Sequence, residues 1–307
     1  MKSYLLLLIG LFYAVSMQAQ PTFSVAHDSL YLTPRDERGL LGLHQSLLDA
    51  STGFTLMSVA AHPDDEDIFS ITYFRRKYGI HTVVVVSNRG EGGQIEIGPE
   101  LYTDLAVVRS HEMAAAERIS GSEYYNLNFV DFGYSKDIQE TFDKWGKEKL
   151  LEKMVYMIRR LRPQVIITNH DSVSGHSNHQ AVGWAIRHAF KLAGDPAAFR
   201  QQLKNGLMPW QPLRLFQRIS TRDTKSRADV VYNVGEFSPL WGMSYAQLAA
   251  RALAQHRSQG FDKFARTLRP GPRNVRYKLV LQANPQLALK SNRHLFAGLN
   301  DPLETIL

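Results

Sequence analysis

No cysteine occurs among the 307 residues of the chain. Its absence excludes disulfide bonds, a lipid anchor on cysteine, a catalytic thiol and every metal site that uses thiolate ligands. A metal ion in this protein must therefore be held by His, Asp or Glu. A chain of this length can bury a core that is stable without disulfide bonds.

Long apolar runs are scarce, and the longest lies at the start of the sequence. Lys2 is followed by an apolar stretch over residues 5–15 and by small and polar residues up to Gln20. This is the layout of a secretory signal peptide, and the stretch is shorter than the roughly 20 residues of a membrane-spanning helix. We therefore expect a signal peptide over residues 1–19, export to the periplasm or the cell exterior, and no stable membrane anchor. An uncleaved anchor is the alternative, favoured by Met17, which is larger than the usual residues of a cleavage site.

Clustered charge of one sign is also lacking. The formal net charge is +7, from 36 Lys and Arg against 29 Asp and Glu. The basic residues are dispersed, and local pairs such as Arg75–Arg76 and Arg159–Arg160 fall on expected helices. Nucleic-acid binding calls for a clustered basic stripe with interleaved aromatic residues. We therefore expect no nucleic-acid partner, and at most a weak preference for anionic glycans.

Short apolar runs and longer amphipathic runs alternate between residues 54 and 194. The apolar runs indicate buried strands near 54–61, 82–86, 124–130 and 165–168. The amphipathic runs indicate helices near 66–78, 105–120, 147–161 and 178–194. Strands that are apolar on both faces are typical of parallel sheets covered by helices on both sides. The alternation predicts an α/β fold, a Rossmann-like three-layer sandwich with a mostly parallel central sheet.

Beyond Pro196 the pattern becomes weaker. It indicates strands near 213–219, 230–234 and 277–282, and a helix near 244–259. Internal repeats, low-complexity tracts and a clear linker are lacking. We predict a single domain over residues 20–307, with a core at about 54–194 and a less regular part over 195–307.

Three polar motifs directly follow predicted strands. Residues 61–66 (AHPDDE) come after the first strand, residues 88–94 (NRGEGGQ) after the second and residues 175–179 (GHSNH) after the fourth. In open parallel sheets, ligands bind in the crevice at the carboxyl ends of the strands. The sequence therefore predicts that the three motifs meet in one active site at this edge of the sheet.

The first and third motifs contain donors that suit a metal ion. His62, Asp65 and His179 offer two imidazole nitrogens and one carboxylate oxygen, and zinc held by three such ligands keeps an open fourth position in catalytic sites. A water in that position has its pKa lowered from about 15.7 to about 7. Asp64 is adjacent to a ligand without being needed as one, so it can accept the proton of that water.

The two motifs together resemble the PIG-L/LmbE superfamily of zinc-dependent N-acetylglucosaminyl de-N-acetylases. The resemblance rests on residues 62–66 (HPDDE) and 176–179 (HSNH), and it extends over about residues 54–194. It implies a hydrolase that removes the N-acetyl group from an amino sugar or glycoconjugate. Zn²⁺ is the implied cofactor, and Fe²⁺ is a second candidate.

The resemblance also implies a role for each residue of the motifs. His62, Asp65 and His179 match the metal ligands of the family, Asp64 matches its general base and His176 matches a histidine that assists the transition state. Asp64 would accept the proton of the attacking water and pass it to the amine. A protonated His176 would stabilise the tetrahedral oxyanion.

Two arginines are candidates for substrate binding. Residues 89–94 are similar to the glycine-rich loop of the family, and the Arg-x-x-Glu of Arg109 and Glu112 resembles the start of its following helix. The resemblance implies that Arg109 contacts substrate, and Arg89 is the second candidate. Some members carry a tyrosine where this chain has Ser174, so any donation by that tyrosine must pass to another group.

Less specific interpretations exist for the same residues. Asp64 or Asp65 could cap the next helix, and Glu66 could be a first-turn residue or a partner of a ligating histidine. His170 directly follows a predicted strand, and its role is left open. The other histidines are interpreted as surface or hydrogen-bonded residues: His27, His44, His81, His111, His188, His256 and His294.

Two other functions fit parts of this pattern. A catalytically inactive glycan-binding module would keep the fold, but it would also tolerate the loss of Asp64. A non-haem iron oxygenase would use two histidines and one carboxylate for Fe(II), but the strand–helix alternation does not fit an all-β barrel. The complete set of ligands and base favours the deacetylase over both.

Overall fold

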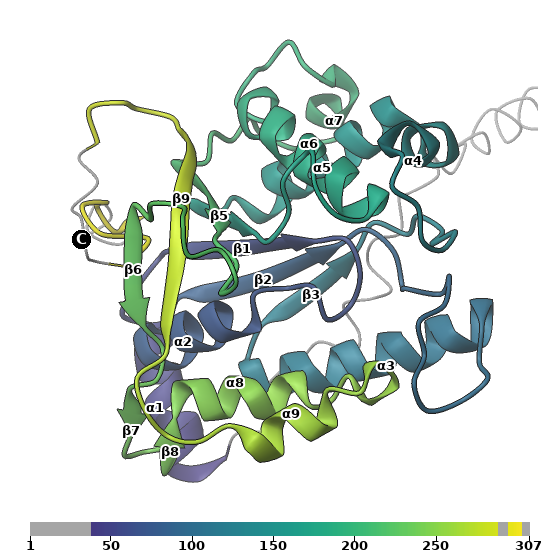
Figure 1. The fold of residues 1–307 in the computed structure, drawn as a ribbon. Coiled ribbons are helices and arrows are strands. Elements are labelled where there is room, and N and C mark those ends of the chain that lie inside the picture. The colour runs from purple at the N-terminus through teal and green to yellow at the C-terminus, as the bar shows by residue number, and fades with distance from the viewer. Residues whose placement is uncertain (1–37, 288–293, 303–307) are drawn as a thin grey trace, which may run out of the picture.

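A computed structural model of the chain describes residues 38–287 and 294–302 (Figure 1). The expected signal peptide over residues 1–19 lies outside the described residues. Within them, no helix combines the length and apolarity needed to cross a membrane.

A seven-stranded sheet forms the middle of the fold, in the order β3-β2-β1-β4-β5-β9-β6. Its strands are β1 (Thr55–Ala60), β2 (His81–Val86), β3 (Glu123–Asn126), β4 (Val165–Thr168), β5 (Arg214–Arg218), β6 (Val230–Asn233) and β9 (Asn274–Gln282). The strands from β1 to β5 are parallel, whereas β9 pairs antiparallel with both β5 and β6. The predicted α/β fold with a mostly parallel sheet is confirmed.

The order of the strands reverses at the centre of the sheet. The chain lays down β1, β2 and β3 toward one edge, and β4 then pairs with the other side of β1. The carboxyl ends of β1 and β4 therefore border the crevice in which doubly wound folds bind their ligands.

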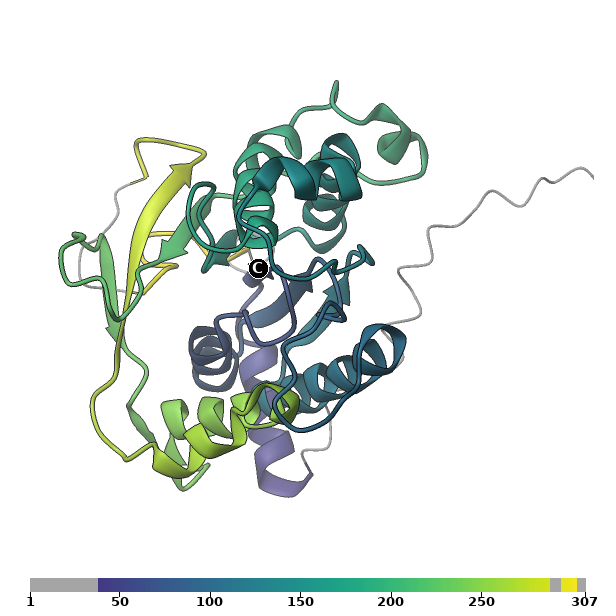
Figure 2. The same ribbon diagram turned by 45° about the vertical axis from the view of Figure 1, so that its right-hand side comes forward.

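Helices cover both faces of this sheet, so the fold has three layers (Figure 1, Figure 2). One helical layer consists of α1 (Gly39–Asp49), α2 (Ile68–Tyr78), α3 (Tyr102–Ser120), α8 (Tyr245–Leu253) and α9 (Asp262–Thr267). The other layer consists of α4 (Ile138–Trp145), α5 (Lys147–Leu161), α6 (Ser177–Leu192) and α7 (Arg200–Lys204). Three short elements complete the described fold: β7 (Phe237–Ser238), β8 (Met243–Ser244) and the 3₁₀ helix η2 (Arg257–Gln259).

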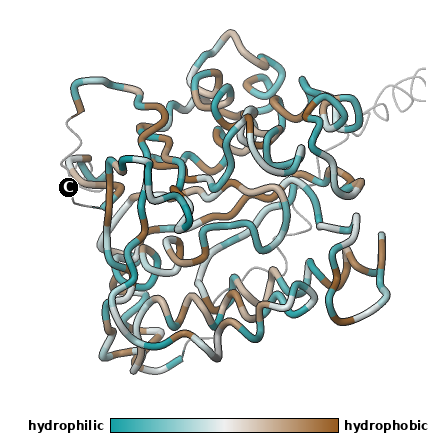
Figure 3. The backbone as a smooth tube through the Cα atoms, in the orientation of Figure 1, coloured by the Kyte–Doolittle hydropathy of each residue, from teal (hydrophilic) through white to brown (hydrophobic). Residues whose placement is uncertain are grey.

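The central strands supply both hydrophobic cores. Leu56 of β1 and Val84 of β2 pack into the core on the side of α2, whereas Met57 and Val83 pack into the core on the side of α5. Successive side chains of a strand point to opposite faces, so the run of valines in β2 is buried on both. Figure 3 shows hydrophobic segments along these strands.

Capping side chains and residues with positive φ mark the ends of several helices and strands. The side chain of Asp67 caps α2 by accepting from the Ser70 N–H, and Gly79 ends that helix at a left-handed φ of 70°. The third strand ends at Asn126, four residues before the predicted end, and Asn128 adopts a positive φ of 56°. The predicted helix near 244–259 ends at Leu253 and continues only as η2.

Candidate active site

Loops at the carboxyl ends of β1 to β4 surround a cavity of about 360 Å³. Its walls come from the β1–α2, β2–α3, β3–α4 and β4–α6 loops, from α3 and α6, and from Gln259 of η2. Of the predicted site residues, His62, Asp64, Asp65, Arg109, His176 and His179 all line it. The structure therefore brings together side chains that are more than 100 positions apart in the sequence.

The side chains of His62, Asp65 and His179 converge on one point. Asp65 Oδ2 lies 2.7 Å from His62 Nδ1 and 3.2 Å from His179 Nε2, and the two ring nitrogens are 3.2 Å apart. Ligand atoms about 2.0–2.1 Å from a tetrahedral zinc ion lie roughly 3.3 Å from one another. The spacing and the chemistry of these three donors fit such an ion.

The backbone between β1 and α2 gives the two aspartates different directions. Asp64 has a left-handed φ of 90°, which is strained for a residue other than glycine. Asp65 Oδ2 turns back and accepts the N–H of His62 at 2.9 Å. Burial alone would raise the pKa of Asp65, but the neighbouring His179 and His62 hold it well below its usual value. Asp65 is therefore ionised, as a ligand must be.

His170 supports this group from the end of β4. Its ring stacks on that of His179, with centroids 4.3 Å apart, and its Nε2 accepts the Ala61 N–H at 3.1 Å. Burial lowers the pKa of His170 to about 3, so the ring is neutral. Its position, left open by the sequence, is that of a support for His179.

The side chain of Asp64 lines the same cavity and is paired with Arg109. Its Oδ1 accepts a hydrogen bond from Arg109 Nη2 at 2.9 Å. Burial raises the pKa of Asp64 to about 7, although the charge of Arg109 opposes the shift. A general base works best when its pKa lies near the working pH. The residue that caps α2 is Asp67 and not Asp64 or Asp65, so the alternative of a capping role for these two residues is wrong, and the role of Asp64 as the base stays a prediction.

Arg109 is buried, and its described hydrogen bonds go to the protein itself. Besides Asp64, its guanidinium donates to the backbone oxygens of Pro63 at 2.6 Å and of Gly90 at 3.1 Å. A Cβ at position 90 would lie 2.1 Å from Arg109 Nη1, so a side chain there would displace the guanidinium, and the positive φ of 68° also favours glycine. These contacts favour a role in positioning Asp64 over the direct substrate contact that the resemblance implies.

Arg89 does not line the cavity that holds the other predicted residues. It lines a separate cavity of about 290 Å³ beside α3 and β3. Its Nη1 donates to Ser110 Oγ at 2.7 Å and its Nη2 to Asn128 Oδ1 at 3.0 Å. These contacts tie the side chain to α3 and to the loop after β3, and the structure offers no support for a role in substrate binding.

His176 is the N-cap residue of α6. Its Nδ1 accepts the Asn178 N–H at 3.0 Å, which places the ring proton on Nε2. Burial and the neighbouring His62 lower the pKa of His176 to about 4. The structure therefore favours a neutral ring that donates from Nε2, in contrast to the protonated ring expected from the sequence.

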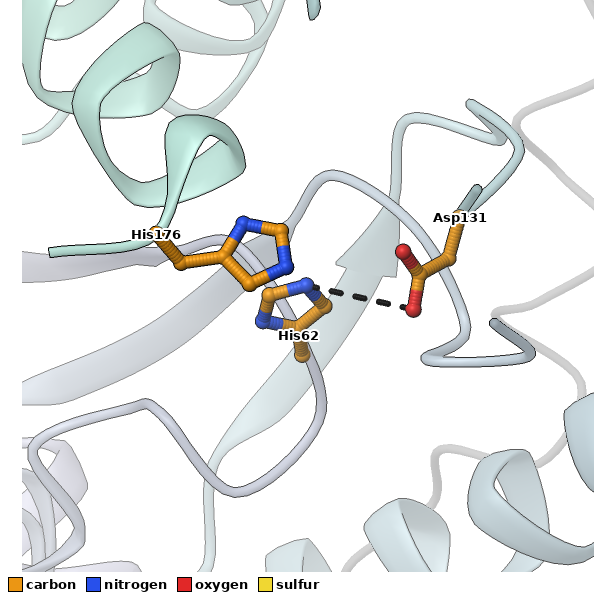
Figure 4. Close-up of side chains that lie close together, drawn as sticks. All are labelled: His62, Asp131 and His176. Atoms are coloured by element: carbon orange, nitrogen blue, oxygen red, sulfur yellow. Dashed lines mark ion pairs between the residues drawn. The ribbon is translucent and has the colours of Figure 1, made fainter. Parts of the chain in front are cut away.

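Asp131, from the loop after β3, is a site residue that the sequence analysis missed. Its Oδ2 lies 4.0 Å from His62 Nε2, opposite the nitrogen that faces Asp65 (Figure 4). The same carboxylate accepts the N–H groups of Gly92 and Gly133 and the side-chain amide of Asn178. His62, Asp131 and His176 form a second group of convergent donors. Because the carboxylate already accepts three hydrogen bonds, it fits better as the partner that orients a ligating histidine.

Tyr134 lies in the same loop and was also missed. It lines the cavity, and its ring lies edge-on to His176 with centroids 5.1 Å apart. A phenol thus faces the site although the sequence has Ser174 at the position where some relatives carry a tyrosine. The only available signal was that the loop follows a strand at the carboxyl edge of the sheet.

A buried acid–histidine pair lies behind Asp64. Glu66 Oε2 accepts the Asp64 N–H at 2.9 Å, and Glu66 Oε1 lies 3.4 Å from Nε2 of His256. Both side chains are fully buried. His256 precedes η2, whose Ser258 binds Glu112 of α3 through its N–H and its hydroxyl. Of the two predicted roles for His256, surface or hydrogen-bonded residue, the structure excludes the surface, because the side chain is fully buried against Glu66 and lies next to the site.

Comparison with known families and proteins adds an independent finding. The family model described as PIG-L, GlcNAc-PI de-N-acetylase, matches residues 57–190. One relative, the 1D-myo-inositol 2-acetamido-2-deoxy-alpha-D-glucopyranoside deacetylase 2 of Catenulispora acidiphila, is 32% identical over 46% of this chain and 52% of its own length. The mycothiol S-conjugate amidase of Streptomyces coelicolor is 30% identical over 52% of this chain and 59% of its own. The chain thus spans a little over half the length of these curated relatives.

Solved structures with the same fold cover more of the chain. The N,N'-diacetylchitobiose deacetylase from Pyrococcus horikoshii aligns with a TM-score of 0.54 and 18% identity, over 86% of this chain and 94% of that protein. GalB, the 4-carboxy-2-hydroxymuconate hydratase of Pseudomonas putida KT2440, aligns with a TM-score of 0.51 and 15% identity, over 76% and 100%. These likenesses establish the fold, which accommodates more than one reaction. The family match covers the motifs that carry the cavity residues, and we refer to the matched residues 57–190 as the PIG-L domain.

Proposed function

We propose that the protein is an exported, zinc-dependent N-deacetylase that hydrolyses the acetamide of an N-acetylglucosamine-type sugar or glycoconjugate. The convergence of His62, Asp65 and His179 beside Asp64, inside a PIG-L domain, carries the proposal. Export rests on the signal-peptide pattern of residues 1–19.

His62 Nδ1, Asp65 Oδ2 and His179 Nε2 would hold the metal ion, because these three atoms lie within 3.2 Å of one another. A zinc ion bound there supplies a Lewis acid that lowers the pKa of a water and polarises the acetamide carbonyl. Fe²⁺ accepts the same donors and is the second candidate.

Side chains of the protein itself carry out the proton transfers. Asp64, held by Arg109, accepts a proton from the attacking water and later gives it to the leaving amine. His176 faces the same cavity and donates from Nε2 to the oxyanion of the tetrahedral intermediate, as donors do in other hydrolases. Tyr134 lines the same cavity, and its phenol would assist this donation. The products are acetate and a free amino sugar.

The substrate class follows from the relatives and from the cavity. The curated relatives are named for an inositol-linked acetamido sugar and a mycothiol conjugate, and one solved neighbour is named for a disaccharide of N-acetylglucosamine. The cavity of about 360 Å³ lies within the usual range of about 300–1,000 Å³ for small-molecule sites. An acetamido sugar ring, free or linked to a second polar group, is the substrate that we infer.

Acetate release from a panel of substrates tests the proposal. The panel consists of N-acetylglucosamine, N,N'-diacetylchitobiose and N-acetylglucosaminyl inositol, each assayed before chelation, after chelation and after addition of Zn²⁺ or Fe²⁺. We expect release that is lost with the chelator and regained with the metal, without uptake of oxygen. Oxygen consumption would favour the oxygenase, and binding without acetate release from any substrate would favour the inactive glycan-binding module.

A further inference from the structure

A buried polar cluster joins the PIG-L domain to the strands that the family model does not cover. Its centre is the carboxylate of Asp67, the N-cap residue of α2, which follows the predicted ligand Asp65 by two positions. Arg218 of β5, Tyr232 of β6 and Tyr277 of β9 each contribute one side chain to the cluster. The three strands that the C-terminal part adds to the central sheet therefore all meet at the start of α2.

The carboxylate of Asp67 accepts hydrogen bonds from four groups. The backbone N–H of Ser70 donates to it at 3.3 Å and the hydroxyl of the same residue at 3.2 Å, as in an ordinary helix cap. Arg218 Nη1 adds a bond to Oδ1, and the Tyr277 hydroxyl adds a bond to Oδ2. Because a helix cap requires only the contacts with Ser70, capping alone does not account for the arginine and the tyrosine.

The partners of Asp67 are held in place by the sheet. Arg218 and Tyr277 are cross-strand neighbours in the β5–β9 pair, so the two donors lie side by side. The ring of Tyr232 stacks on that of Tyr277 with centroids 5.8 Å apart, and its hydroxyl donates to Ser70 Oγ at 2.9 Å. Asp67 and Tyr277 are almost completely buried, and a buried charge that loses a partner is strongly destabilised. The start of α2 is therefore fixed by the C-terminal strands.

The segment between Asp67 and the metal-binding donors is short and closely bonded. The N–H of Asp67 donates to Ser58 Oγ at 3.3 Å, which ties the start of α2 to β1, the strand that leads into the site. Glu66, the next residue toward the site, accepts the N–H of Asp64 with its side chain at 2.9 Å. A shift of Asp67 would therefore move Asp65 and Asp64 as well.

We propose that Arg218 and Tyr277 are positioning residues for the metal site. They hold Asp67, and with it the β1–α2 loop, in the conformation in which the three predicted donors converge. This role rests on the metal site of the proposed function and extends it. Without the cluster, the loop would spend part of its time in conformations that do not bind metal, and the apparent Kd rises as the competent fraction falls. Strands outside residues 57–190 thus set the metal affinity of the site.

Two variants test this role, and a third is a matched control. Tyr277→Phe removes a single hydroxyl and keeps the aromatic ring, whereas Arg218→Met removes the ion pair with Asp67. Tyr73→Phe is the control, because it removes the hydroxyl of a buried tyrosine of α2 that donates to Glu236 and not to Asp67. The measured quantity is the Kd for Zn²⁺, obtained by competition with a chromophoric chelator well below the melting temperature of each variant.

We expect the Kd to rise by about 3- to 10-fold in Tyr277→Phe, which is less than the roughly 10- to 100-fold for a partner bonded directly to a ligand. Arg218→Met should raise the Kd further, because it leaves the buried carboxylate of Asp67 without its counter-charge. Arg218→Lys should restore part of the affinity. Tyr73→Phe should lower the melting temperature without changing the Kd.

Turnover gives a second readout. Zn²⁺ in excess shifts the loop toward the conformation that binds it, so kcat of Tyr277→Phe at saturating Zn²⁺ should be close to that of the wild type, whereas its activity at limiting Zn²⁺ should fall. Equal Kd values in the wild type and both cluster variants would confine the cluster to stability and overturn the positioning role, as would an equal rise in Tyr73→Phe. Absence of acetate release from every substrate, with the expected shifts in Kd, would count against the proposed reaction alone.

Discussion

The PIG-L domain and the C-terminal part of the chain contribute to the candidate site in different ways. Residues 57–190 supply every atom that we assign to metal binding and proton transfer. The later residues add β5, β9 and β6 to the same sheet and place His256 and Gln259 at the edge of the site. In the proposed function the chemistry thus resides in the PIG-L domain, whereas the part that the family model does not cover supports the site from behind. Variants on the two sides of this division should therefore behave differently.

The largest effect is expected from a metal-binding donor of the PIG-L domain. His179→Ala removes one of three convergent donors, so the protein should lose its metal and with it nearly all activity. Elemental analysis of the purified variant, together with acetate release, measures both. His188→Ala is the control, because it removes an exposed histidine from the same helix, α6. A His179→Ala protein that kept one metal ion per chain would refute the ligand assignment.

Asp64→Asn should have the next largest effect, and it separates proton transfer from metal binding. Loss of a general base costs on the order of 10²–10⁴ in rate, while the asparagine keeps the shape of the side chain and leaves the three donors intact. The variant should therefore retain its metal. Loss of the metal would instead show that Asp64 and Asp65 have been assigned the wrong way round.

The pH dependence gives a second test of Asp64. The base must be ionised, and burial raises its pKa to about 7, so kcat/KM should fall as the pH is lowered through that region. A bound cation favours the ionised form and moves this arm to lower pH. The acid arm should be absent from the residual activity of Asp64→Asn. Its persistence would mean that another ionisation controls it.

Sequence reasoning predicted regular elements better than it predicted contacts between distant loops. Periodicity predicted β4 and α5 with the ends that the structure has, because their burial follows from neighbouring residues in the sequence. The residues of the motifs that follow the parallel strands lie together as expected, because the carboxyl ends of these strands meet at the same edge of the sheet. Asp131 and His256 were missed because their partners, Asn178 and Glu66, are far away in the sequence and only the folded chain makes them neighbours. The short helices α1, α4, α7 and α9 were also missed.

A variant of Arg109 tests whether this residue positions the base Asp64 or binds substrate. Arg109→Lys keeps the positive charge but cannot reach Asp64, Pro63 and Gly90 together. Because hydrogen bonds to a charged group contribute about 1.5–3 kcal/mol, kcat should fall by roughly 10- to 100-fold. KM should change little, in contrast to the rise in KM that the resemblance implies. A raised KM with unchanged kcat would restore the role of Arg109 in binding substrate.

The smallest effect on rate is expected from the C-terminal part, at His256. His256 lies next to Glu66, whose other oxygen accepts the N–H of the strained Asp64, so the histidine supports the base through one intermediate residue. His256→Leu leaves the buried carboxylate of Glu66 without this partner and should lower both the melting temperature and kcat, with metal content unchanged. Because the effect is indirect, the fall in kcat should be smaller than in Arg109→Lys.

His256→Gln provides the matched comparison, because glutamine restores a side-chain N–H donor toward Glu66. This variant should recover part of kcat even if its melting temperature stays low. If the histidine had only a structural role, its replacement would lower the stability of the protein without changing the turnover of the folded fraction. Measurement of kcat well below the melting temperature of both variants separates the two effects. Equal kcat in wild type, His256→Leu and His256→Gln would confine the C-terminal part to stability and would leave proton transfer to the PIG-L domain alone.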